Sequence, residues 1–306
     1  MDYVAILLLA LALDIVFGEL PNQVHPVAAI GRVISWQLRF APKNNKEAFF
    51  YGIFIALFTI AIFSVPIYIL LWYLRDINAV LFVLVGAVCL KNTFSLKELG
   101  CAARRVQSPL RVGELTKARE AVGRIVSRNT SCLERDAVVA ATIESVSENT
   151  SDSFVAPLFY FLLLGVPGAL AYRVANTLDA MVGYHGEYEY LGKFSARMDD
   201  ILNYIPSRIS GLLVVLVANL ARGSMARAWH VMWRDHANTE SPNAGWTMSA
   251  TAGALGLRLE KEGQYSLGDT IVPVSVEAIS QGVRIMWLSA CVWTIVCSFI
   301  TWMVLA

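Results

Sequence analysis

Charged residues are scarce in this sequence. Asp, Glu, Lys and Arg make up 16% of the 306 residues, whereas 56% are hydrophobic and the mean hydropathy is +0.54. A soluble domain usually carries about 25% charged residues, so the deficit favours a membrane over water as the solvent. The net charge is only +1, and proteins that bind nucleic acid usually present a strongly basic face. The composition therefore indicates a membrane protein without a nucleic-acid partner.

Motifs for metal or nucleotide binding are also missing. The five cysteines form no CxxC pair, which argues against a zinc site or a disulfide framework. No GxGxxG occurs, and Gly186–Lys193 has the wrong spacing for a phosphate loop, with Phe194 where Ser or Thr is required. No standard nucleotide-binding fold is therefore expected. The chain also begins without the basic region of a secretory signal peptide, so a signal peptide is not expected either.

Long apolar runs are present instead. Spanning the hydrocarbon layer takes about 20 mostly apolar residues, and residues 48–74, 78–96 and 286–306 are long enough. The runs 154–171, broken at Gly165–Gly168, and 209–221 fit re-entrant hairpins or buried helices, although an ordinary kinked span fits as well. We predict an all-α, polytopic integral membrane protein with several transmembrane helices and short or re-entrant helices.

Basic residues predict the orientation. Residues 97–135 hold nine Lys and Arg against four acidic residues, and such loops face the cytoplasm. We therefore predict one membrane domain over 1–306, with a cytoplasmic helical insertion at 97–152 and the amino terminus outside. The apolar stripe within 115–126 predicts a helix on the anionic membrane surface, or equally one packed on the protein. Ser131 and Glu134 form a capping box, which predicts a helix from Cys132 to about Asn149.

An acidic cluster follows in the same helix. Glu144, Glu148 and Asp152 are spaced by four, which places them on one helical face. Carboxylates at a membrane boundary are costly unless they are paired or bind a metal, and Mg²⁺ prefers such oxygen ligands. The alternative is a solvated acidic face that begins the next segment.

Two more polar clusters and two polar loops stand out. Arg173, Asn176 and Asp179 recur in steps of three and share a helix face, and Asp199 and Asn203 share another, with Arg197 and Arg208 nearby to bind an anionic oxygen. Isolated residues of these kinds are usually surface ion pairs. A turn with His25 follows the first apolar run, although a lone histidine is more often structural than catalytic. Residues 235–245 form a second polar turn, preceded by Arg227 and Arg234.

Taken in order, these stretches resemble the adenosylcobinamide-phosphate synthase family of cobalamin biosynthesis (CobD/CbiB type). The similarity covers about residues 10–260, and its pieces are specific as a set. The matching stretches are His25-Pro26-Val27, Ile30-Gly31-Arg32, Glu144-Ser145, Glu148–Asp152, Ala156–Tyr160, Tyr172-Arg173, Asn176–Asp179, Gly183-Tyr184, Ala196-Arg197, Asp199-Asp200, Asn203, Ile205-Pro206, Arg208 and Ser241–Gly245. The chain departs from the family at Glu19-Leu20-Pro21, where Asp-Pro is expected, and at Thr239-Glu240, where His-Pro is common.

The resemblance implies an ATP-dependent carbon–nitrogen ligase. It would join a carboxyl of adenosylcobyric acid to the amine of (R)-1-amino-2-propanol O-phosphate, or of free aminopropanol. The implied cofactors are ATP and Mg²⁺, and the implied partners are the corrinoid and aminoalcohol substrates, the lipid bilayer and a homo-oligomer. The implied location is the cytoplasmic membrane, with the active-site loops facing the cytoplasm.

The resemblance also assigns roles to residues. The expected catalytic residues are Glu144, Glu148, Asp199 and His25. The expected metal ligands are Asp152, Asp179 and Asp200. Substrate and phosphate binding would fall to Arg173, Asn149, Asn176, Arg197, Asn203, Arg208 and Asn243.

Two other functions remain as alternatives. Asp199-Asp200-x-x-Asn203 also suits an integral-membrane, Mg²⁺-dependent transferase acting on a diphosphate, although a second aspartate-rich motif is missing. A corrinoid transporter would also place charges within the bilayer, but here the charges concentrate in loops.

Overall fold

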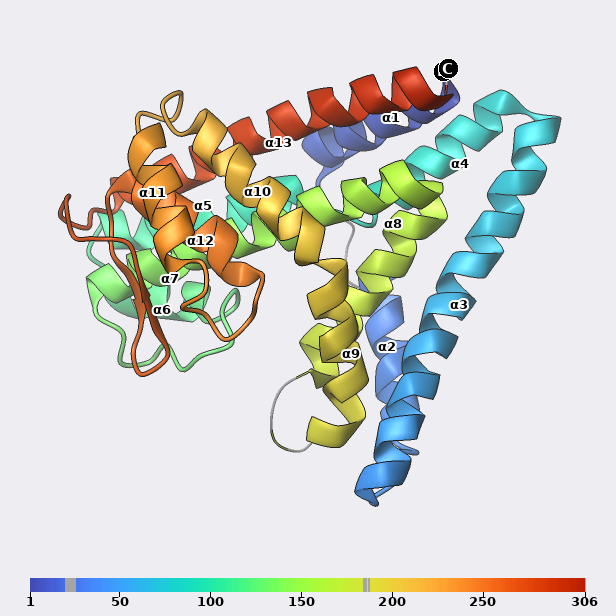
Figure 1. The fold of residues 1–306 in the computed structure, drawn as a ribbon, viewed down its shortest axis with the longest axis horizontal. Coiled ribbons are helices and arrows are strands. Elements are labelled where there is room, and N and C mark those ends of the chain that lie inside the picture. Colours follow the sequence, from blue (N-terminus) through green and yellow to red (C-terminus); the bar gives the residue numbers. More distant parts are fainter. Residues whose placement is uncertain (20–25, 184–185, 187, 306) are drawn as a thin grey trace. The chain divides into compact units, whose positions relative to one another are not determined.

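The computed structural model describes residues 1–19, 26–183, 186 and 188–305, and it is built almost wholly from helices (Figure 1). The chain forms two compact units. The first unit comprises Met1–Ser95, Ala156–Asn203 and Val296–Ala306, and the second comprises Leu96–Val155 and Tyr204–Ile295. The second unit begins one residue before the predicted insertion at 97–152. The single membrane domain over 1–306 stays a prediction.

The first unit contains six complete helices in the described part of the chain. They are α1 (Asp2–Phe17), α2 (Pro26–Leu38), α3 (Asn45–Ile77), α4 (Ala79–Lys91), α8 (Ala156–Val182) and α9 (Glu189–Leu202). The end of α13 (Glu277–Leu305) belongs to this unit as well.

The second unit combines shorter helices with a small hairpin. Its helices are α5 (Leu96–Arg111), α6 (Leu115–Val122), α7 (Arg135–Thr150), the π-helical turn η1 (Ser151–Val155), α10 (Tyr204–Val217), α11 (Met225–Asp235), α12 (Ala244–Leu255) and the first part of α13. Strands β1 (Leu259–Lys261) and β2 (Tyr265–Leu267) pair antiparallel, with Leu259 opposite Leu267. The sequence did not predict this hairpin.

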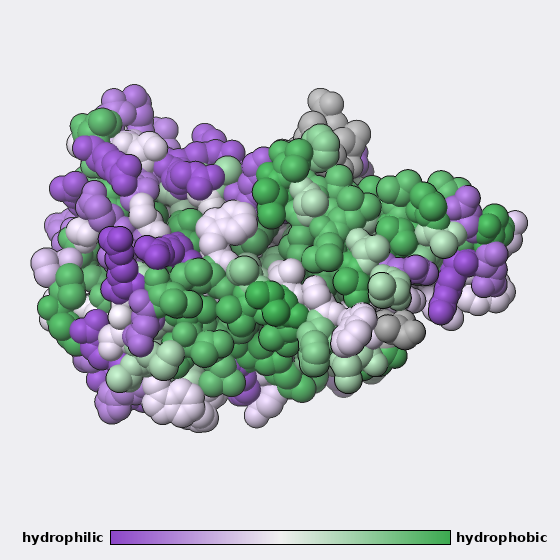
Figure 2. Space-filling view, turned by 90° about the horizontal axis from the view of Figure 1, so that it is seen from above, coloured by the Kyte–Doolittle hydropathy of each residue, from purple (hydrophilic) through white to green (hydrophobic). Residues whose placement is uncertain are grey.

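Four helical stretches are long and apolar enough to cross a membrane. They are Asn45–Ile77, Ala79–Arg111, Arg135–Val182 and Glu277–Val304, and α9 with α10 would make a fifth if they count as one broken span. Large apolar side chains such as Phe54, Leu57 and Trp72 of α3 are exposed, and Figure 2 shows broad apolar areas at the surface. Exposed apolar surface of this extent marks contact with lipid. The protein is a helical, polytopic membrane protein, as the sequence predicted.

The predicted interruption within residues 154–171 is confirmed. Gly165 in α8 has φ 67° and ψ −161°, a conformation that is strained for any residue with a Cβ atom. The helical path therefore breaks at Gly165, and two helical segments follow one another (Figure 1). The part of α8 before the break, residues 156–164, is only about 14 Å long, which is less than half the thickness of the hydrocarbon layer.

A buried ion pair joins α1 to α4. The Nζ of Lys91 lies 3.7 Å from Oδ1 of Asp14, and both side chains are almost fully buried. A charge in an apolar interior is costly unless an opposite charge lies beside it. The two buried charges therefore compensate each other.

Close backbone contacts hold α9 against α3 and α8. A Cβ atom at Gly192 would lie 1.7 Å from the carbonyl oxygen of Val182, and one at Gly52 would lie 2.0 Å from that of Leu191. Beside these contacts, Ile34, Ile55 and Leu178 belong to a fully buried cluster. The glycines thus fix the position of α9, which carries Asp199 and Asp200.

Helix α12 forms the centre of the second unit. From Gly245 to Leu255 every residue is buried, as expected for a helix covered on all sides. Its small residues permit close packing, because a Cβ atom at Gly253 would lie 2.6 Å from the carbonyl oxygen of Arg227 on α11. This contact sets how α11 lies on α12.

In the second unit one local prediction is corrected and one open alternative is decided. Helix α7 begins at Arg135 rather than Cys132, because Ser131 hydrogen-bonds to Asn129 instead of capping a helix. Helix α6 buries Ala118 and Val122 completely. Its apolar stripe is therefore covered by protein, which favours the packed helix over one lying on the membrane surface.

We predict that Gly192→Ala destabilises the first unit. The added methyl group would meet the Val182 backbone, which has little freedom to move, and overpacking of this kind costs about 1–3 kcal/mol. Gly31→Ala is the matched control, because its nearest neighbour, Sδ of Met181, would lie at an ordinary 3.6 Å. Thermal unfolding in detergent should show a lower Tm for Gly192→Ala alone. Equal Tm values for the two variants would contradict the close contact.

Candidate functional site

Asp199 stands at the centre of a polar network in the first unit. Asn203 donates from Nδ2 to Oδ2 of Asp199 at 2.9 Å, and Asn176 donates from Nδ2 to Oδ1 at 3.3 Å. Each carboxylate oxygen therefore accepts a hydrogen bond from a neutral amide. The spacing of four between Asp199 and Asn203 was predicted to place them on one face, and it does. The structure further adds Asn176 from α8, 23 residues away.

Two tyrosines orient this network. The Tyr172 hydroxyl donates to Oδ1 of Asn203 at 2.8 Å, which leaves the amide nitrogen of Asn203 to face Asp199. The Tyr160 ring stacks on Tyr172 with centroids 5.3 Å apart and planes 10° apart, and its hydroxyl donates to the Leu202 carbonyl at 2.9 Å. Asn203, which binds the Asp199 carboxylate, is thus itself held in place by Tyr172.

Other predicted residues lie beside this network in the first unit. Arg173 and Asp179 are half-buried on α8, as is Asn176, which agrees with the shared face. Arg197 contacts Asp200 at 3.5 Å, but its side chain is 76% exposed. That pair is a surface contact, which contributes little energy.

A second group of charged residues lies in the second unit. Arg128 donates from Nη2 to Oε2 of Glu144 at 2.7 Å, and the Tyr265 hydroxyl donates to the same oxygen at 3.2 Å. Glu144 is nearly fully buried, and within the described residues its Oε1 has no hydrogen-bond partner. Burial, followed by the negative charges of Glu144 and Glu148, raises the pKa of Tyr265. One oxygen of this buried carboxylate is therefore bound by two donors, and the other is buried without a donor among the described residues.

The rest of the predicted acidic face is less regular. Asn149 donates to the Ser145 carbonyl at 2.9 Å and accepts from Ser153 at 3.2 Å. Helix α7 ends at Thr150, so Asp152 falls in the π turn η1. The regular spacing of four therefore holds for Glu144 and Glu148 but does not extend to Asp152.

Arg208 and Asn243 meet in the second unit. The Arg208 guanidinium lies 3.5 Å from the Tyr204 ring centroid and 4.8 Å from that of Trp246. Its Nη1 approaches Oδ1 of Asn243 at 3.5 Å, and Ser207 donates to the same oxygen at 3.3 Å. An arginine held between two aromatic faces keeps its outer donors oriented. Two residues expected from separate motifs thus form one group.

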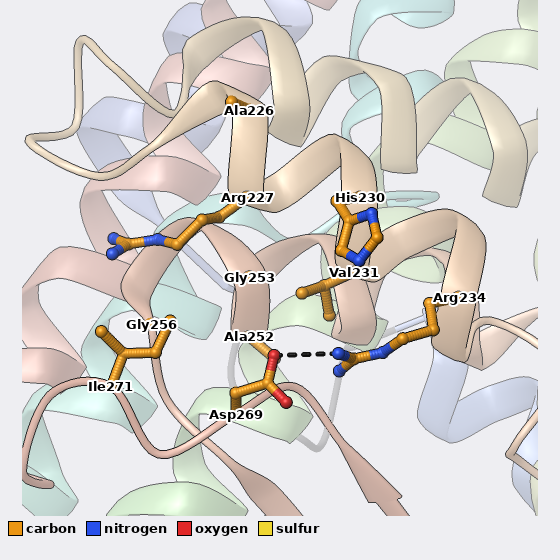
Figure 3. A pocket seen from close by; sticks show the side chains of 10 residues that line it. All are labelled: Ala226, Arg227, His230, Val231, Arg234, Ala252, Gly253, Gly256, Asp269 and Ile271. Atoms are coloured by element: carbon orange, nitrogen blue, oxygen red, sulfur yellow. Dashed lines mark hydrogen bonds and ion pairs between the residues drawn. The ribbon is translucent and has the colours of Figure 1, made fainter.

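A cavity of about 360 Å³ lies between α11, α12 and the segment around Asp269 (Figure 3). Arg227, His230 and Arg234 line it from α11. None of the three was a predicted site residue. Their spacing of three and four was readable in the sequence, but nothing in the sequence showed that α12 and a later loop would close a cavity over them.

A model of the CobD/Cbib protein family matches residues 7–286. The chain belongs to the CobD/CbiB family. It is 48% identical to a cobalamin biosynthesis protein CobD of Dehalococcoides mccartyi, over 97% of this chain and 96% of that one. It is 38% identical to a probable cobalamin biosynthesis protein CobD of Methanothermobacter thermautotrophicus, over 96% and 97%. It is also 38% identical to a cobalamin biosynthesis protein CobD of Citrobacter koseri, over 92% of each chain. No solved structure matches it.

The expected metal ligands of this CobD-family chain do not form a dedicated metal cage. Among residues 1–19, 26–183, 186 and 188–305, no three His, Cys, Asp or Glu side chains gather closely enough to hold an ion. Mg²⁺ often keeps several waters and uses one or two carboxylates together with substrate phosphates. The partly exposed carboxylate of Asp200 is of the kind that could hold an ion in that second way. His25, the remaining catalytic candidate, lies outside the described residues.

We predict that Asp235 makes the stability of the second unit sensitive to acid. Burial alone would raise its pKa, but hydrogen bonds from Arg234 and from the backbone N–H of Gly268 outweigh it and lower the pKa. A carboxyl with a lowered folded-state pKa stabilises the fold above its unfolded pKa of about 3.9, and this contribution is lost as the pH falls through the folded value.

Asp235→Asn should therefore lower the stability at pH 7 by about 1–3 kcal/mol, because it weakens charge-assisted hydrogen bonds to a buried group. Tm measured between pH 7 and pH 3 should then fall less steeply for the variant than for the wild type. Parallel curves would show that Asp235 does not contribute in this way.

Proposed function

We propose that this chain is an ATP-dependent amide ligase of cobalamin biosynthesis. It would join a carboxyl of adenosylcobyric acid to the amine of (R)-1-amino-2-propanol O-phosphate, or of free aminopropanol, to give adenosylcobinamide phosphate or adenosylcobinamide. Its family and the names of its relatives support a role in that pathway. The basic loop at 97–135 supports a location in the cytoplasmic membrane with the site facing the cytoplasm.

The reaction sets two chemical requirements. A carboxylate resists attack by an amine, so it must first be activated, most simply by phosphorylation of one carboxyl oxygen by ATP, with ADP as the leaving group. The amine then attacks the carbonyl carbon, phosphate leaves with that oxygen, and the nitrogen loses a proton. The protein must therefore hold phosphates in place and provide an acceptor for the proton.

The Asp199 network is the observation that carries the proposal. It brings together residues from two separate family motifs, Asn176 of α8 and Asp199 with Asn203 at the end of α9. Because its hydrogen-bond donors are neutral amides, no cation neutralises this carboxylate among the described residues, and a substrate ammonium could pair with it. We assign Asp199 as the group that binds this ammonium and accepts its proton.

Glu144 has a different role in this scheme. Arg128 and Tyr265 already occupy one of its oxygens, so the charge of Glu144 is largely compensated. We assign it to hold Arg128 and Tyr265 in position. Arg208, fixed between Tyr204 and Trp246, is the best-oriented cation for a phosphate among the predicted residues.

Mg²⁺ fits this scheme as an ion that arrives with ATP. Asp200 is the residue beside Asp199 that would hold it, and Asp152 and Asp179 remain candidates by resemblance. The ion would shield the negative charge of the phosphates during transfer.

The direct test is an assay with the purified full-length protein. Adenosylcobyric acid, ATP, Mg²⁺ and each form of aminopropanol would be supplied, and the products followed by mass spectrometry. The proposal expects an amide product that depends on ATP. ATP hydrolysis or corrinoid binding without any amide product would contradict it, and transport of corrinoid into vesicles would favour the alternative of a transporter.

We predict that Asp199→Asn lowers kcat by a factor of roughly 10²–10⁴, because it removes the proton acceptor but keeps the shape of the side chain. Asp76→Asn is the matched control, since Asp76 is exposed at the end of α3. Both variants should elute as the wild type does in size-exclusion chromatography. If Asp199→Asn retained full turnover, Asp199 would not be the acceptor.

A further inference from the structure

A cavity of about 300 Å³ lies within the first unit, among α1, the last turns of α3, the start of α4 and the middle of α8. None of its lining residues belongs to the Asp199 network or to the cavity beside α11. Small-molecule pockets occupy about 300–1,000 Å³. This space is therefore large enough for a small ligand or for one end of a larger molecule.

The break in α8 forms one wall of this cavity. Residues 161–167, which are the end of the first part of α8 and the turn that follows it, line the space. A Cβ atom at Gly165 would lie 3.6 Å from Cε1 of Tyr3, so the turn lies against the start of α1. The cavity is thus placed at the break of α8, beside the first residues of the chain.

One face of α3 forms another wall. Tyr68, Leu71, Trp72 and Arg75 all line the cavity, and residues spaced by three and four lie on the same side of a helix. Tyr and Trp side chains gather at the boundary between membrane and water, and Arg extends its charge toward the headgroups. The order along α3, from apolar and aromatic side chains to a cation near the end of the helix, matches the order of acyl chain, glycerol and phosphate in a phospholipid.

Packed aromatic rings complete the lining. Tyr3 meets Phe82 edge-on, with ring centroids 5.7 Å apart, and its ring lies 6.2 Å from that of Phe161. Phe82 and Phe161 are buried, so their neighbours hold them in place. The cavity therefore has a preformed apolar floor.

Arg75 supplies the charge at this site. Among the described residues that line the cavity it is the one charged side chain, and it is exposed. Within the described part of the chain no carboxylate forms an ion pair with it, whereas Arg128 and Arg234 each have such a partner. A cation without a counterion favours a ligand with a net negative charge, because a zwitterionic headgroup brings its own cation.

The rim of the cavity shows from which side a ligand arrives. Leu163, Leu164 and Tyr68 are each more than half exposed, so the cavity opens onto apolar surface of the kind that contacts lipid. A small water-soluble anion would pair with Arg75 but would leave these apolar walls uncovered. A lipid covers both. Only its phosphate, its glycerol and the first carbons of its chains fit the space itself.

We propose that this cavity binds one anionic phospholipid, with its phosphate on Arg75 and its glycerol beside Tyr68 and Trp72. The rest of its acyl chains lies on the exposed apolar surface of α3 and α8. The unpaired cation, the aromatic wall and the opening toward lipid carry the inference together. It is independent of the ligase reaction, since no residue of the cavity belongs to the candidate active site.

The test is native mass spectrometry of the full-length protein in detergent, titrated with phosphatidylglycerol or with phosphatidylcholine of the same acyl chains. The wild type should bind the first phosphatidylglycerol more tightly than the first phosphatidylcholine. Arg75→Gln should reduce that preference roughly 5-fold, because one arginine near a headgroup contributes about that factor. Arg39→Gln is the matched control, since Arg39 is also exposed in the first unit but does not line the cavity. It should keep the preference of the wild type.

Two more variants separate the charge from the apolar wall. Arg75→Lys retains the charge and should retain the preference. Tyr68→Ala removes an exposed ring, which leaves the core intact, and should weaken binding of both lipids by a similar factor. An equal loss of preference in Arg75→Gln and Arg39→Gln would mean that anionic lipid is attracted to the protein as a whole, and the inference would fall. Unchanged binding of both lipids to Tyr68→Ala would show that they bind elsewhere.

A soluble probe distinguishes a lipid from a free phosphate compound. Glycerol 3-phosphate carries the phosphate and glycerol without acyl chains, so it should not displace phosphatidylglycerol at equal concentration. Displacement as efficient as that by a second phosphatidylglycerol would identify a water-soluble phosphate as the occupant and would overturn the inference.

Discussion

Every charge inside this apolar, helical protein needs a partner, and this constraint shapes the structure more than any other. Few charged residues are available, and removing one from water is costly unless an opposite charge or a hydrogen-bond donor compensates it. The pairs Lys91–Asp14, Arg128–Glu144 and Arg234–Asp235 follow this rule. Asp199 follows it differently, because two neutral amides bind its carboxylate and no cation pairs with it among the described residues. That difference sets Asp199 apart as a group available to a substrate.

The two units offer different chemistry. The first unit provides a hydrogen-bond acceptor, held by amides and by the stacked rings of Tyr160 and Tyr172. The second provides cations that are fixed in orientation, such as Arg208 between two aromatic rings, and one donor that is still open, on Arg227. The proposed ligation, in which phosphate and then a proton are transferred, would need both kinds of group.

Much of the fold was predictable because its signals are local. Hydropathy over some 20 residues predicts a span, and the glycines and proline at 165–168 predict a break in one. Spacings of three and four predicted which side chains share a face of α8 or α9.

Contacts between distant residues could not be predicted. The hydrogen bond of Tyr265 to Glu144 is an example, because it joins residues 121 positions apart. The cavity escaped prediction for the same reason, since α11, α12 and a later loop form it together. The capping-box error at Ser131 had a local cause, because Asn129 competes for the same hydroxyl.

The central claim is that the protein activates a carboxyl group by phosphorylation and then transfers the acyl group to an amine. The most direct measurement follows the oxygen atoms. Adenosylcobyric acid labelled with ¹⁸O in the reacting carboxyl would be incubated with the purified protein, ATP, Mg²⁺ and aminopropanol phosphate, and the released inorganic phosphate analysed by mass spectrometry. The account predicts that one labelled oxygen appears in the phosphate for each amide formed. Amide formed with unlabelled phosphate, or labelled carboxyl recovered unchanged after ATP has been consumed, would contradict it.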